Sequence, residues 1–462
     1  MKTASNTFFC ISFLLSFFLE ARSTKTPPSV KRHFYRPQKI TFADIQHAVT
    51  PYKKADIQLY LPHLSLNKAR AIGHEYRSII KINQELWRSL KRSELIPISE
   101  YLPQVRFSMS ASNNRADVLP TKQLDVIITQ LLYQGNGPIQ KYKIAVHESE
   151  ISWWQVALIK DQVQSQVEQS YLSLWRTQQE ERSIYFLHQA ATHEFDQGWN
   201  VNNVGLLAKP EWEQEHARYA SALSIINGYQ DRKKLDHDKL KFFVGKKKID
   251  ESLAVKSTLE FLANNLSSAQ KYDLPFYLKN AFKLRKELRI NEQEILKEQR
   301  KRDLFAQSYL PTIFVQTNIT NTFFRRGSTP SGTFWQIALR LDWQFDGLGN
   351  AHRARANDAI VLAKMIERIN TQNIITVEVQ TAYHTVQGQL KELQAAQAQL
   401  KQQQAQYERA VVQHDIGEIN GVAFSRAQET WEQAQFDVMN LTVKTVQNYR
   451  DLLFKAGYPD NL

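Results

Sequence analysis

The sequence predicts an α+β membrane protein built from a duplicated unit of helix, strand, strand, long helix and returning helix. Three observations predict this fold: glycines that recur at one spacing, two pairs of strand-like segments, and two long tracts without proline. The recurring glycines lie 212 residues apart, as the pairs Gly135 and Gly347, Gly137 and Gly349, Gly205 and Gly417, and Gly245 and Gly457. Self-similarity at a fixed period indicates a repeat architecture.

The first 23 residues have the pattern of a secretory signal. Lys2 precedes a mostly apolar run over 8–19, and the small-residue stretch Ala21-Arg22-Ser23 follows. The apolar run is too short to span a bilayer as a helix, and no later stretch is long enough. The only cysteine, Cys10, lies inside this signal, so cleavage near Thr24 leaves no thiol for a disulfide, a metal site or catalysis. Residues 24–60 are basic, have no counterpart in the repeat and are expected to form an N-terminal extension.

The first copy of the unit is expected over 61–250. Its first helix, about 64–98, leads into Tyr101-Leu102-Pro103, where the proline cannot continue a helix and restricts the preceding leucine to extended geometry. Apolar and polar residues then alternate with a period of two, which is typical of a strand. The apolar positions are Val105, Phe107, Met109 and Ala111. The copy is therefore expected to hold strands over about 104–112 and 122–134 and helices over about 139–203 and 206–244.

A linker over 251–272 separates this copy from the second, expected over 273–458, and a short tail follows over 459–462. The second copy repeats the pattern at Tyr309-Leu310-Pro311, 208 residues after the first. Its elements are expected as a helix over about 275–307, strands over about 312–320 and 333–346, and helices over about 350–415 and 420–456. The last strand gives the clearest alternation, with Trp335, Ile337, Leu339, Leu341, Trp343 and Phe345 at every second position.

The long helices carry a coiled-coil spacing. Val386, Leu393, Leu400 and Tyr407 lie seven residues apart. A helix of about 60 residues is roughly 90 Å long, which is too long for a compact domain.

The four strands of one chain are expected to cross a membrane. Their apolar side chains resemble the outward face of a transmembrane barrel, and Trp335 and Trp343 are placed to lie at the membrane interfaces. Four strands cannot close a barrel, and an open edge in lipid leaves backbone groups unpaired. Several chains must therefore contribute, and three chains would supply twelve strands around an aqueous lumen. The sequence thus predicts a trimeric β-barrel in a membrane, from which the long helices hang as a periplasmic tube.

The sequence contains no recognisable motif for catalysis or for binding a cofactor. Gly135-Asn136-Gly137 and Gly347-Leu348-Gly349 each follow a strand, but both lack the third glycine of a dinucleotide fingerprint. His193-Glu194 lacks the second histidine of a zinc-protease helix and is expected to face solvent. We therefore expect no catalytic residue, cofactor or metal. The net charge of +13 is spread over an exported chain, so nucleic acid is not expected as a partner.

The order of elements and the Tyr-Leu-Pro and Phe-Asp-Gly motifs resemble the TolC-like outer membrane efflux family across about residues 61–458. The match is stronger in the second copy, at Tyr309-Leu310-Pro311, Trp343-Gln344-Phe345-Asp346-Gly347 and the turn at Gly417. The resemblance implies a homotrimer in the outer membrane of a Gram-negative bacterium, with a large periplasmic part that forms an α-helical barrel. It also implies a passive exit duct of a tripartite efflux or type I secretion system. Its partners would be a periplasmic adaptor and an inner-membrane RND pump or ABC exporter.

The resemblance also places a periplasmic gate near the turns at Gly205 and Gly417. The candidate gate residues are Glu211, His414, Glu418 and Arg426. Family members often carry acidic residues six positions after the turn glycine, where this chain has Glu211 in the first copy but Ala423 in the second. The alternative reading of the whole chain is a periplasmic coiled-coil adaptor or interaction module without a barrel.

Overall fold

The computed structural model describes residues 64–112, 121–203, 209–245, 255–323, 332–343 and 347–458. All of them belong to one compact unit, Gln58–Leu462, and a second unit covers Met1–Ile57. The predicted signal over 1–23, the N-terminal extension over 24–60 and the tail over 459–462 lie outside the described residues.

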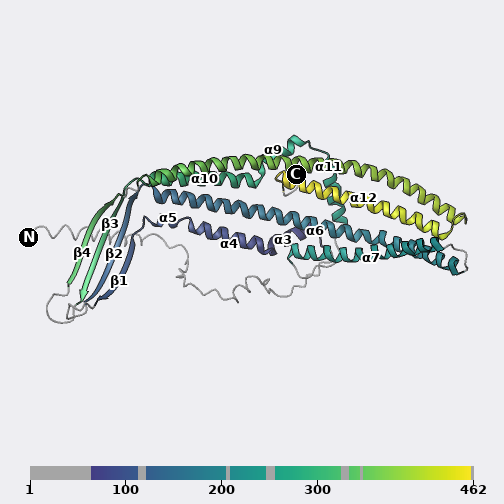
Figure 1. Cartoon of the computed structure of the whole chain (residues 1–462), viewed down its shortest axis with the longest axis horizontal. Helices are drawn as coiled ribbons and strands as arrows, with labels where there is room; N and C mark the ends of the chain where they lie inside the picture. The colour runs from purple at the N-terminus through teal and green to yellow at the C-terminus, as the bar shows by residue number, and fades with distance from the viewer. Residues whose placement is uncertain are drawn as a thin grey trace, which may run out of the picture. The chain divides into compact units, whose positions relative to one another are not determined.

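The elements follow the predicted duplicated order (Figure 1). The first copy contains α3 (Leu66–Tyr76), α4 (Ser78–Ser93), α5 (Ile96–Ser99), β1 (Gln104–Ser112), β2 (Thr121–Gln134), α6 (Gly137–Asn203) and α7 (Lys209–Val244). The second contains α9 (Leu274–Leu284), α10 (Lys286–Gln307), β3 (Thr312–Phe323), β4 (Gly332–Asp342), α11 (Gly349–Asp415) and α12 (Gly421–Lys455). An additional helix, α8 (Val255–Ala269), lies in the segment expected to be a linker. None of the described helices combines the length and the apolar character needed to cross a membrane.

The expectation of one unbroken helix before each strand pair was wrong. The first helix is interrupted at Arg77, whose ψ of 113° is extended, and the second is interrupted at Arg285, whose ψ is 125°. Neither residue is a glycine or proline, so propensity gave no sign of a break. Tertiary contacts account for it, because each arginine bonds to the backbone of a distant helix.

The four strands form one antiparallel sheet in the order β1-β2-β3-β4. The register is continuous across the sheet, since Phe107 pairs with Val126, Val126 with Ile319 and Ile319 with Trp335. One irregularity interrupts β2 between Leu131 and Tyr133, where a bulge adds a residue against β3. Figure 1 shows the strands gathered at one end of the long helices.

The strand-to-helix turns are built alike in the two copies. Gly135 and Asn136 have φ of 48° and 59°, and Gly347 and Leu348 have φ of 63° and 72°. This left-handed geometry favours glycine. At Gly135 a Cβ atom would also lie 2.6 Å from the carbonyl oxygen of Gln307. These glycines therefore serve the chain reversal between sheet and helix.

Two apolar cores hold the helices together, one for each copy. The first joins α3, α6, α7, α8 and α12 around the fully buried Tyr171 and Trp175. The second joins α9, α10, α11 and α12 around Tyr277, Ile375 and Tyr449. Because α12 contributes to both cores, the two copies pack as one body.

Candidate functional site

One face of the sheet is mostly apolar over all four strands, with a few polar side chains such as Gln130 and Thr317. Side chains of directly paired residues lie on the same face of a sheet, so the register defines this face. It carries Val105, Phe107 and Met109 of β1, Leu124, Val126 and Ile128 of β2, Ile313, Val315 and Ile319 of β3, and Trp335, Ile337, Leu339 and Leu341 of β4. Within one chain much of the face is open to the surroundings; Phe107 is 71% exposed and Leu339 is 70% exposed. A patch of this size in a single chain indicates a contact with lipid or protein.

The opposite face is mostly polar. It carries Arg106, Ser108, Ser110, Gln123, Asp125, Thr129, Gln316, Asn318, Thr320, Gln336, Arg340 and Asp342, together with a few apolar side chains such as Phe334. Asp125 of β2 accepts a hydrogen bond of 2.8 Å from Thr320 of the neighbouring β3 and another of 2.8 Å from Gln123 on its own strand. Alternation between an apolar and a polar face is the pattern of a barrel wall between lipid and a wet lumen.

Trp335 lies near the start of β4, and Trp343 directly follows its last residue. Eight residues separate them, which is about 26 Å at a rise of 3.3 Å per residue. This distance matches the height of the apolar band of an outer-membrane barrel, about 25 Å. The indole of Trp343 donates a hydrogen bond of 2.9 Å to the carbonyl oxygen of Tyr309. The polar edge of this ring is therefore fixed at the junction of sheet and helices.

The sheet is open at both edges within the described strands. β1 and β4 each pair with one neighbour only. The long outer rows of backbone N–H and C=O groups at these edges need partners if lipid surrounds them.

The other end of the helices holds the candidate gate residues. His414 lies in the last turn of α11, and its ring stacks on Phe424 with centroids 4.7 Å apart. Glu418 is exposed in the turn after Gly417, which has a φ of 79°. Glu211 belongs to α7, but its side chain and the first-copy turn at Gly205 lie outside the described structure.

Arg426 takes part in an ion cluster that no local pattern indicated. On α12, Arg426 pairs with Glu194 of α6, whose side chain is only 2% exposed. Arg218 of α7 lies 3.0 Å from Glu194 and 3.8 Å from Glu429 of α12. We refer to Glu194, Arg218, Arg426 and Glu429 as the inter-repeat ion cluster, because it joins helices of both copies.

A second set of polar contacts connects α6 and α12 beside this cluster. His193 and Ser425 lie 2.8 Å apart, Arg182 pairs with Glu432 at 2.7 Å, and Ser183 bonds to Gln433. His193 is exposed, as expected, although its ring contacts Ser425. The expectation that Glu194 faces solvent was wrong, because Glu194 is buried. The partners of these two residues on α12, Ser425 and Arg426, lie 232 residues away in the chain, and no local pattern indicates such a pairing.

Burial changes the acidity of one member of the cluster. The pKa of Glu429 is raised above its ordinary value, mainly because the carboxyl group loses water, and the neighbouring Arg218 only partly offsets this. The described residues contain no group of three His, Cys, Asp or Glu side chains that is placed to hold a metal ion. The chemistry of this end is thus that of ion pairs between helices.

Known structures with the same arrangement are outer membrane channels. The chain matches the CmeC outer membrane channel of Campylobacter jejuni with a TM-score of 0.68 and 14% identity, over 85% of this chain and 86% of that one. It matches the outer membrane protein VceC of Vibrio cholerae with a TM-score of 0.66 and 12% identity, over 85% and 96%. The match to the open state of the MtrE outer membrane channel of Neisseria gonorrhoeae has a TM-score of 0.65 and 12% identity, over 85% and 89%.

At the level of sequence, no protein-family model and no curated protein matches the chain. The relationship is therefore one of architecture, carried by a four-stranded sheet, two long helical hairpins and their order in the chain. The protein has the fold of the TolC-like outer membrane channels.

Proposed function

We propose that this protein is an outer-membrane exit duct, through which solutes pass passively from the periplasm or from an inner-membrane pump to the exterior. The observation that carries the proposal is the sheet, whose four strands present one mostly apolar and one mostly polar face. Trp335 and Trp343 lie about 26 Å apart along the direction of the last strand, at 3.3 Å per residue. The strands continue into helices of 67 residues. The shared fold with outer membrane channels supports it. The protein would act as a conduit and carry out no catalysis.

The duct requires several copies of the chain. A meander of four antiparallel strands has edge strands that run in opposite directions, so β4 of one copy can pair with β1 of the next without a break in the antiparallel order. Three copies give twelve strands, which leaves an aqueous lumen, whereas about eight strands are filled by side chains. We therefore propose a homotrimer that places its apolar face in outer-membrane lipid.

The partners follow from the same proposal. In a tripartite efflux or type I secretion system, a periplasmic adaptor would contact the helical hairpins, and an RND pump or ABC exporter in the inner membrane would supply the cargo. The far ends of α6, α7, α11 and α12 reach away from the sheet and are the parts available to such partners (Figure 1).

We place the gate of the duct at these far ends. Glu211, His414, Glu418 and Arg426 are the candidate constriction residues. The inter-repeat ion cluster extends this set, because a shift of α12 relative to α6 and α7 must separate Arg426 from Glu194 and Glu429 from Arg218. Charged groups in a ring of three copies would then influence which solutes pass.

The first test is to fractionate cells that express the full chain, extract the outer membrane in mild detergent and measure the mass by light scattering. The duct predicts a trimer in the outer-membrane fraction. A soluble periplasmic monomer would contradict the proposal and leave the coiled-coil adaptor as the reading of this chain.

A further inference from the structure

The two helix breaks occupy equivalent places in the repeat. Arg77 and Arg285 lie 208 residues apart, the same spacing as the two Tyr-Leu-Pro motifs. In each case the arginine N–H closes the helix before the break, bonding to the carbonyl oxygen of Gly73 at 3.2 Å and of Ala281 at 3.0 Å. Each arginine is also the residue from which the next helix starts.

Both arginines reach the end of a returning helix. Arg77 Nη1 donates to the carbonyl oxygen of Phe242 in the last turn of α7 at 2.9 Å, and Arg285 Nη1 donates to that of Lys455, the last residue of α12, at 3.2 Å. The last carbonyls of a helix have no partner within the helix and carry partial negative charge. A guanidinium therefore satisfies them by hydrogen bonding and by charge.

A glycine with positive φ completes each contact. Gly245 follows α7 with a φ of 76°, and Gly457 follows α12 with a φ of 87°. A Cβ atom on Gly245 would lie 3.3 Å from the Cβ of Tyr76, and one on Gly457 would lie 2.7 Å from the Cβ of Leu284. The returning helix thus ends directly against the residue before the arginine in both copies.

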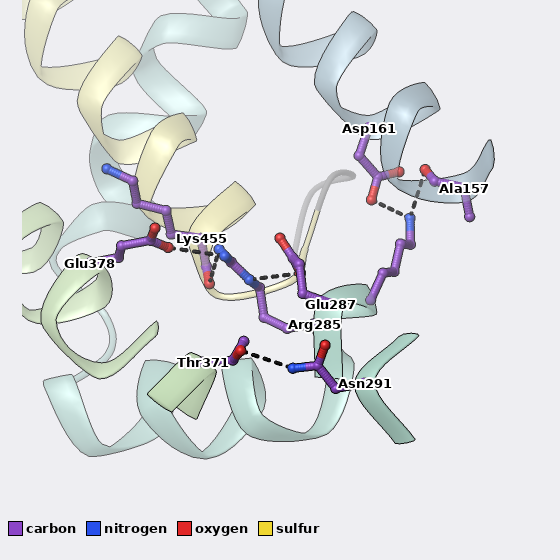
Figure 2. A network of polar contacts seen from close by, with 9 residues as sticks. Ala157, Asp161, Arg285, Glu287, Asn291, Thr371, Glu378 and Lys455 are labelled. Carbon is purple, nitrogen blue, oxygen red and sulfur yellow. Dashed lines mark hydrogen bonds and ion pairs between the residues drawn. The ribbon is translucent and has the colours of Figure 1, made fainter. Parts of the chain in front are cut away.

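The second contact is the more strongly charged of the two, as Figure 2 shows. The buried Arg285 pairs with Glu287 at 3.0 Å and with Glu378 of α11 at 2.9 Å. Lys286 pairs with Asp161 of α6, a helix of the first copy. Arg77 instead lies against aromatic rings, 4.3 Å from the centroid of Phe242.

We infer that Arg77 and Arg285 are equivalent positioning residues, which join α4 end to end with α7 and α10 end to end with α12. Each joined pair then runs beside one uninterrupted helix, α6 or α11, and Figure 1 shows the two members in line. The second join also fastens one copy to the other through Lys286 and Asp161. These joins are features of the fold and do not depend on what passes through the protein.

The role of Arg285 is tested by hydrogen exchange on the purified full-length protein, read by mass spectrometry. Arg285→Met removes the donor, so the amides of the last turn of α12 should exchange about tenfold faster, consistent with the loss of a charge-assisted hydrogen bond. Arg285→Lys keeps the positive charge but loses the planar set of N–H donors of the guanidinium group, and it should give a smaller change in exchange rate. Arg289→Met is the matched control, because Arg289 is exposed and its ion pair in the described part of the chain is with Glu292 on its own helix.

The same measurement on Arg77→Met should speed exchange in the last turn of α7 and leave the end of α12 unchanged. If Arg285→Met does not accumulate in cells, Gly457→Ala is used in its place. Its added methyl group would clash with Leu284 and so disturb the same contact between α12 and α10. Unchanged exchange at the end of α12 in these variants, or an equal change in Arg289→Met, would overturn the inference. Trimer formation and transport are not measured in this comparison, so its failure is distinct from failure of the proposed duct.

Discussion

The rings of Tyr407 and Trp431 stack with centroids 4.6 Å apart and an angle of 3° between their planes, joining α11 to α12. Phe195 and Tyr219, which lie 212 residues earlier, stack at 4.7 Å and 27° between α6 and α7. The duplication therefore extends to a specific side-chain contact near the far end of each hairpin, although neither pair is identical in sequence. A contact at this place fixes the register of the two antiparallel helices.

Replacing Tyr407 and Trp431 by alanine, singly and together, should show coupling between them. Stacked aromatic pairs contribute about 0.5–1.5 kcal/mol beyond the area they bury. The double variant should therefore lose less free energy of unfolding than the sum of the single variants by about that amount, as measured by chemical denaturation. The cycle on Phe195 and Tyr219 should give a similar value. Additive effects in both cycles would show that the rings only fill space.

The two faces of β4 should respond oppositely to a charge. Ile337→Lys places an ammonium on the apolar face near the middle of the strand, which should cost about 2–4 kcal/mol in a bilayer. The yield of protein that folds into vesicles should fall accordingly. Ala338→Lys, one residue later and on the polar face, is the control and should fold nearly as well as the parent chain. Equal losses in both variants would argue against a lipid-facing sheet.

Reversal of the charge at Arg426 should loosen the far end of the hairpins. Arg426→Glu puts a second carboxylate beside the buried Glu194, so repulsion between two carboxylates replaces the attraction of the ion pair. In planar bilayers we expect a higher single-channel conductance than for the parent protein. Arg409→Glu changes an exposed arginine of α11 by the same charge and should have little effect. A conductance that both variants alter equally would assign the change to general electrostatics.

The sheet could be predicted because the first and last strands show a period of two and the repeat could be checked against itself. β1 has the predicted bounds, and the other strands start within one residue of their predicted positions. The long helices α6 and α11 were found because no proline occurs from Ile139 to Lys209 or from Ser331 to Tyr458, and a heptad spacing runs through the second of them. The breaks at Arg77 and Arg285 were missed, since hydrogen bonds to residues 165 and 170 positions away cause them.

The candidate gate was located only in part. Resemblance to a known family selected Arg426, and its role in a gate stays a prediction. Its partner Glu194 was predicted to face solvent, because the residues around a single Glu on a long helix do not show whether that Glu is exposed or buried. Glu194 becomes buried only when α6, α7 and α12 pack together. Pairings of this kind require the tertiary arrangement.

The raised pKa of Glu429 predicts a stability that falls as the pH rises. Because burial makes the folded state hold this proton more tightly than the unfolded state, the contribution is present below the ordinary carboxyl pKa. It is lost as the pH rises through the higher folded value. Glu429→Gln should therefore melt at a higher temperature than the parent protein at neutral pH, and the difference should shrink on acidification. Glu392→Gln, at an exposed position of α11, should show no such trend.

Glu168 should be the most costly single carboxylate to remove. It is buried on α6 between Arg70 of α3, at 2.9 Å, and Arg450 of α12, at 2.8 Å. Glu168→Gln removes the negative charge that two arginines share, and loss of one partner of a buried pair costs about 3–5 kcal/mol. Chemical denaturation should show this loss, whereas Glu85→Gln, which affects only an exposed pair with Arg88, should change stability by less than about 1 kcal/mol. A small effect at Glu168 would mean that water or neighbouring groups compensate the arginines, and the packing of α3 against α6 and α12 would then depend on the apolar core around Tyr171 alone.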